Sequence, residues 1–133
     1  MDDLAFIRER IPAYADYPDE EARHLVDKQV RAWVGEALGR MEERLGKLPV
    51  ELEDRLEEIL LLCEFTNQRF VRSIDHAKLS EDDVEHLHVV DRQLVESADR
   101  AATIEAVALG DYLSEIEELF KRRSKAVLAP APA

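Results

Sequence analysis

Apolar residues recur every three or four positions along most of the chain, which is the spacing of one face of an α-helix. One such stripe predicts a helix from about residue 18 to residue 46. Pro18 and the acids after it suit a first helical turn, and Gly46 suits a helix end. Acid-to-base pairs four residues apart, such as Asp27 with Arg31, are expected on the outside of this helix. The predicted core face comprises Ala22, Val26, Gln29, Val30, Trp33, Ala37, Met41 and Leu45.

A second stripe predicts a helix from 49 to about 78. Its apolar face comprises Leu52, Leu56, Ile59, Cys63, Thr66, Phe70, Ile74 and Ala77. Leu61 and Phe65 do not belong to this face, because at 100° per residue they project about 140° or more from its centre, one helical turn apart. Large apolar side chains on an outer face indicate a covering element or a partner chain.

Two further helices are predicted, a short one over residues 2–10 and a long one that starts after Ser80 and runs from 81 to 124. The long helix would measure about 65 Å and would overhang its neighbours, which measure about 43 Å. The apolar overhang begins near Gly110. Either the chain breaks at Gly110-Asp111 and folds back, or the overhang packs against a second chain. We favour a homodimer. Its predicted interface comprises Leu61, Phe65, Tyr112, Leu113, Ile116, Leu119 and Phe120.

These elements predict an all-α antiparallel bundle of three long helices, with a short N-terminal helix and a C-terminal helical segment beyond Gly110. Turn residues are too scarce for a β fold, since Pro49 is the only proline between residues 19 and 124. We expect one domain over residues 1–125, followed by a flexible Ala/Pro tail over 126–133.

Composition narrows the possible partners and the compartment. The chain has 30 acidic and 18 basic side chains, a formal net charge of −12, which disfavours binding to nucleic acid or to anionic lipid. Cys63 is the only cysteine and lies in an apolar run, where it is interpreted as a small buried hydrophobic residue. The longest purely apolar run is five residues, too short for a membrane span, and no signal-peptide pattern is present. The cytoplasm is therefore the expected location.

The four histidines provide one candidate site. In an antiparallel bundle His24, His76, His86 and His88 come to the same end, and Glu85 precedes His88 by three residues, the spacing of ligand pairs in di-iron bundles. The periodicity, however, points most of these side chains outward. Solvated histidines are the first interpretation, with no cofactor predicted. A surface or inter-chain site for zinc or nickel is the alternative.

Two acids on the apolar face of the fourth helix provide the second candidate. Asp91 is predicted to lie opposite Arg69 to Arg72, and Glu105 opposite Arg55, so that buried salt bridges would set the helix register. The alternative is a cavity walled by small residues, in which Glu105 with a raised pKa could act as an acid or base.

No phosphate-binding loop, Cys-x-x-Cys, nucleophile elbow or zinc-protease motif occurs. The sequence therefore predicts a non-enzymatic interaction or scaffold protein, homodimeric, that binds another protein. The alternative is a metal-binding or small-ligand bundle that uses the histidine-rich end or a cavity near Glu105.

Overall fold

The computed structural model describes residues 2–64 and 78–128 and confirms an all-α fold, with no strand in either range. In chain order the helices are α1 (Asp3–Arg10), α2 (Glu20–Leu45), α3 (Val50–Glu64), α5 (Glu81–Arg100) and α6 (Leu109–Leu128). A short 3₁₀ turn, η1 (Ala106–Ala108), precedes α6.

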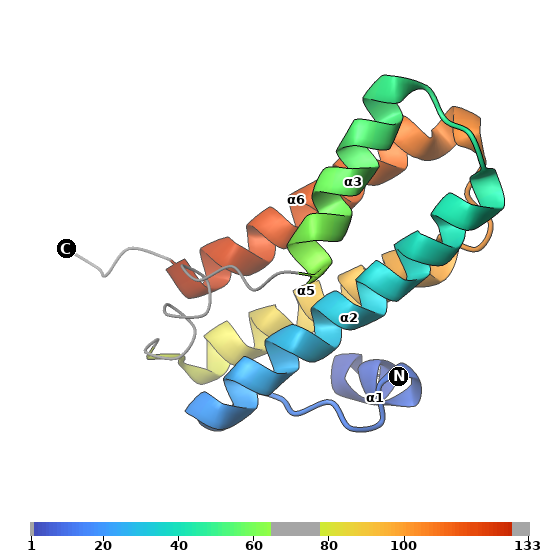
Figure 1. Ribbon diagram of the computed structural model, residues 1–133. Coiled ribbons are helices and arrows are strands. Elements are labelled where there is room, and N and C mark those ends of the chain that lie inside the picture. Colours follow the sequence, from blue (N-terminus) through green and yellow to red (C-terminus); the bar gives the residue numbers. More distant parts are fainter. Residues whose placement is uncertain (1, 65–77, 129–133) are drawn as a thin grey trace.

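The four longer helices surround one core (Figure 1). Helix α2 packs against both α3 and α5, and α6 packs against α5 and α3, so each helix has two neighbours. Helix α1 lies against α5 on the outside of this arrangement. The largest fully buried apolar side chains are Ile7, Leu38, Met41, Leu56, Ile59, Leu87, Leu94, Leu109, Leu113 and Ile116.

The helix starts follow from local capping chemistry. The Asp19 carboxylate accepts a hydrogen bond of 2.8 Å from the Ala22 amide, so α2 begins just after Pro18 rather than with Pro18 in its first turn. The helix start predicted after Ser80 is confirmed, and Ser80 and Asp83 form a reciprocal capping box there. Gly46, at φ 69°, ends α2 in a backbone conformation that other residues rarely adopt.

The long helix predicted over 81–124 is instead two helices that fold back on each other. Helix α5 ends at Arg100, well before Gly110, and Gly110 lies inside the first turn of α6. The Arg44 guanidinium donates hydrogen bonds to the carbonyl oxygens of Ala101 at 2.8 Å and Ile104 at 2.5 Å. It thereby satisfies backbone acceptors that the end of a helix leaves open.

Because the chain folds back, the apolar face of α6 packs against α5 and α3 of the same chain. The structure buries Tyr112, Leu113, Ile116 and Leu119 in the core and half-buries Phe120, which corrects their prediction as contacts with a second chain. The Tyr112 hydroxyl also donates a hydrogen bond to the Ser97 carbonyl of α5. Helix α6 continues to Leu128, so residues 126–128 are helical rather than part of a flexible tail.

Within the two ranges that the structure describes, no helix combines the length and the apolar character that a membrane span requires.

Candidate functional site

Four charged side chains form a buried network between α2, α5 and α6. Arg123 of α6, 2% exposed, donates from Nε to Asp91 Oδ1 at 2.8 Å and from Nη1 to Asp27 Oδ1 at 2.6 Å. Arg31 Nη2 lies 2.6 Å from Asp27 Oδ2. Two guanidinium groups thus neutralise two carboxylates, which is the condition under which charges can be buried without a prohibitive loss of hydration.

Two tyrosines of the connector between α1 and α2 complete the network. The hydroxyl groups of Tyr14 and Tyr17 both donate to Asp91 Oδ2, Tyr14 at 2.6 Å. Burial is the main cause that raises the pKa of both tyrosines, and the Asp91 carboxylate raises them further. Both hydroxyls therefore stay protonated and keep donating. His88 Nε2, 2.6 Å from Asp16 Oδ1, attaches the same connector to α5.

This network joins α2, α5, α6 and the connector, and its two carboxylates are balanced by its two guanidinium groups. Asp91 is 0% exposed and already accepts hydrogen bonds from three side chains. The prediction that Asp91 forms a buried salt bridge is confirmed, with Arg123 as its partner. Arg69 and Arg72, the partners predicted for it, lie outside the described residues. The Asp27–Arg31 pair, predicted on the outside of its helix, is buried instead.

The prediction for Glu105 is wrong. Glu105 is exposed and precedes η1 in an extended conformation, because the chain has already left the helical path. Its predicted partner Arg55 instead donates from Nη2 to Ser114 Oγ at 2.9 Å and to Glu117 Oε1 at 3.2 Å. The small residues near Glu105 that were expected to wall a cavity include Ala102, Ala106 and Ala108, and these three are exposed as well.

Among the described residues, His24, His86 and His88 do not converge on one site. His88 is half-buried against Asp16, His86 and Glu85 are exposed, and His24 is half-buried near the start of α2. His76 lies outside the described residues. In the part of the chain that the structure describes, no group of three or more histidine, cysteine or acidic side chains has the arrangement of a metal site.

Sequence reasoning missed Arg123, Asp27 and the two tyrosines as members of the network. Arg123 follows Ile116 by seven residues and Asp27 precedes Val34 by seven, so both are in phase with buried apolar positions. A charged residue in phase with an apolar stripe is the signal that predicts Asp91 as buried, and the same signal applies to Arg123 and Asp27. The tyrosines lie in a connector without helical periodicity, where no comparable signal exists.

Cys63 is buried where α3 approaches α2, as its apolar surroundings predicted. A Cβ atom built on Gly35 would lie only 2.9 Å from the Cys63 Cβ, so glycine permits this close contact. Burial raises the pKa of the Cys63 thiol to about 12, and the Arg31 charge lowers it by a smaller amount.

We expect Cys63 to react with Ellman's reagent at pH 8 at least about 1000-fold more slowly in the folded protein than in urea. At a pKa of about 12 roughly 10⁻⁴ of the thiol is ionised at pH 8, against about a fifth at the unfolded value near 8.5. The folded rate should rise about tenfold per pH unit from pH 8 to 10. Glutathione at each pH provides the reference, and similar rates with and without urea would contradict a buried thiol.

A groove of about 430 Å³ lies between α2, α3 and α6, on one side of the buried network. Asp27, Arg31 and Arg123 reach it from the interior. Its remaining lining combines apolar and charged side chains and comprises Glu58, Ile59, Leu62, Glu117, Phe120, Lys121, Ser124 and Lys125. Leu62 is 46% exposed, and the adjacent Leu61 is 50% exposed. The outward position predicted for Leu61 is therefore confirmed, whereas Phe65 lies outside the described residues.

No protein-family model matches the chain, and no curated protein or solved structure shows a significant similarity to it.

Proposed function

We propose that the protein is a non-enzymatic interaction or scaffold protein that binds another protein chain in the groove between α2, α3 and α6. The observation that carries this proposal is the half-exposed Leu62, which lines the groove together with Ile59 and Phe120 and is preceded in the chain by the half-exposed Leu61. Contiguous apolar surface with a charged rim is typical of protein–protein contacts. We further propose that the protein acts as a homodimer in the cytoplasm, where its single thiol would stay reduced.

The interior chemistry supports a non-enzymatic role. Asp91 and Arg123 are bound to each other, and Asp27 is bound to Arg123 and Arg31. A general acid or base must reach the atoms of a substrate. These side chains are instead paired with one another, which stabilises the packing of the helices. The alternative, a metal-binding or small-ligand bundle, depended on the histidine-rich end or on a cavity near Glu105. Neither site supports it, because Glu105 is exposed and the histidines within the described ranges do not converge.

The proposal is tested by incorporating the photoreactive residue p-benzoylphenylalanine at position 62 and irradiating cells that contain the protein. We expect adducts heavier than the chain itself, because a partner seated in the groove would lie against this side chain. In the matched control, p-benzoylphenylalanine replaces Val107, which is 93% exposed on η1 and does not line the groove. Absence of adducts at position 62, or the same adducts from both positions, would refute a binding role for the groove.

A further inference from the structure

Leu61 is an apolar side chain surrounded by acids on the outer surface of α3. Glu57 and Glu58 lie one helical turn before it and Glu64 one turn after it, so all three share its side of the helix, and all three are exposed. Helix α3 as a whole contains six acidic residues and one arginine. This surface therefore combines one apolar contact point with strong negative charge.

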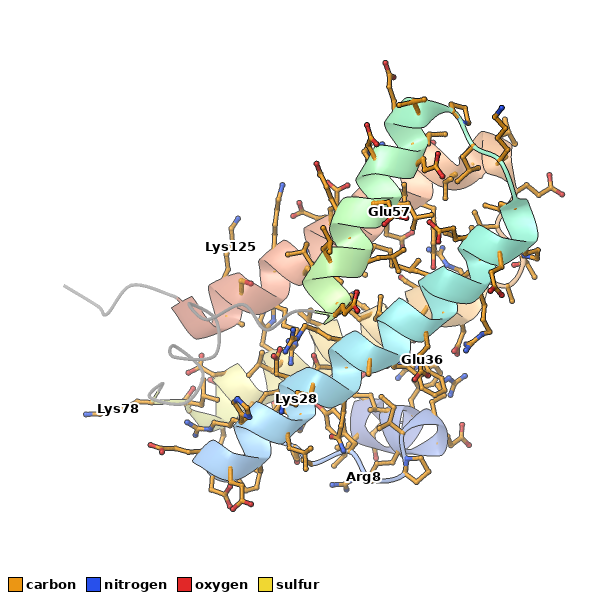
Figure 2. All side chains as sticks on the ribbon, viewed as in Figure 1. Arg8, Lys28, Glu36, Glu57, Lys78 and Lys125 are labelled. Atoms are coloured by element: carbon orange, nitrogen blue, oxygen red, sulfur yellow. The ribbon has the colours of Figure 1, made fainter. Side chains whose placement is uncertain are left out.

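The opposite wall of the groove has the opposite charge. The last eight residues of α6, 121–128, contain four basic side chains and no acid. Arg123 is buried in the network and Arg122 lies 3.8 Å from Glu118. Lys121 and Lys125 are exposed and take part in no ion pair within the described residues. Figure 2 shows Lys125 projecting from the end of α6 into solvent.

We infer that the chain seated in the groove is a second copy of this protein, whose Leu61 packs beside Lys121 and Lys125. This inference rests on the proposed function, since it names the partner at the same groove. In the pairing, the glutamates around Leu61 of one protomer face the two lysines of the other, and Leu61 contacts the groove beside Phe120. Opposite charges on the two surfaces favour this encounter.

Two features select this pairing over others. Leu61 directly precedes Leu62, which lines the groove, and both leucines are half-exposed, so the protruding side chain and the groove adjoin on α3, as a two-fold dimer with two identical contacts requires. The net charge of −12 makes most other pairings of two copies repulsive, and the basic end of α6 is where a second acidic chain is attracted.

The test uses two charge-reversal variants of the full chain and measures mass by light scattering. Wild type is expected at twice the 15.3 kDa mass of one chain. Lys121→Glu/Lys125→Glu and Glu58→Lys/Glu64→Lys should each raise the dissociation constant of the dimer by about 100-fold, because each places like charges opposite one another. An equimolar mixture of the two variants should recover the dimer, since each half of the mixed interface again pairs opposite charges.

The matched control is Arg8→Glu/Lys47→Glu, which changes the net charge by the same amount as the double lysine variant. Both residues are exposed and away from the groove, and Figure 2 shows Arg8 and Lys125 on opposite sides of the molecule. This variant should stay dimeric. Circular dichroism of each variant establishes that it is folded, and the mixing experiment separates a lost contact from a lost fold.

Several outcomes would overturn the inference. They are a wild type with the mass of one chain, variants that remain dimeric, or a mixture that fails to recover the dimer. The proposed function is refuted by a different result, the absence of adducts from p-benzoylphenylalanine at position 62. Adducts from position 62 to another protein, combined with a monomeric wild type, would retain the groove as an interaction site and exclude a second copy as its occupant.

Discussion

An Arg123→Met variant is expected to lose about 3–5 kcal/mol of unfolding free energy, because it leaves the Asp91 and Asp27 carboxylates buried without their shared cation. Methionine is apolar and flexible, so the loss should report the missing charge more than a missing volume. Urea denaturation at neutral pH, followed by helical circular dichroism, measures the change.

Arg122→Met is the control for this experiment. Arg122 is the preceding residue on the same helix, its side chain is 51% exposed, and its contact with Glu118 measures 3.8 Å. Exposed pairs of this kind contribute little, so we expect a change within about 0.5 kcal/mol. If both substitutions cost the same small amount, Arg123 does not hold two buried carboxylates in the folded protein.

Leu113→Ala is expected to cost about 2–5 kcal/mol, because the Leu113 side chain is 0% exposed and its truncation leaves a cavity in the core. The loss would show that Leu113 of α6 is buried in a packed core. The measurement is the urea midpoint and slope at one fixed protein concentration, which keeps any contribution from association constant between variants.

Val107→Ala provides the comparison for the core truncation. Val107 lies just before α6 and is 93% exposed, so its truncation should change the unfolding free energy by less than about 0.5 kcal/mol. Equal effects of the two substitutions would mean that α6 does not pack against α5 and α3.

The parts of the fold that could be predicted from the sequence are those decided by neighbouring residues. Asp19 and Ser80 cap helices through hydrogen bonds to amides three residues away, and Gly46 ends α2 through its own backbone conformation. The end of α5 is different. It depends on Arg44, whose hydrogen bond reaches Ala101 across 57 positions, while the apolar period continues in phase through Gly110 and favours a single helix.

The candidate site divides in the same way. Asp91 was found because an acid within an apolar stripe is unusual, and the need for a buried cation followed. Arg123 was not predicted as that cation, because a run of basic residues near the end of a helix is also what the helix dipole favours. Lys121 and Arg122 fit that explanation and are exposed. Arg123, one position further, is turned inward by 100° and is buried.

The separation of the network partners along the chain has a consequence for how the protein is made. Arg123 is synthesised 32 residues after Asp91, so this carboxylate leaves the ribosome before its cation, whereas Arg31, a partner of Asp27, follows Asp27 by only four residues. Until Arg123 is available, packing α5 into the core would bury the Asp91 charge without its cation, at a cost in free energy. Burial of Asp91 is therefore favoured only once α6 can pack against α5.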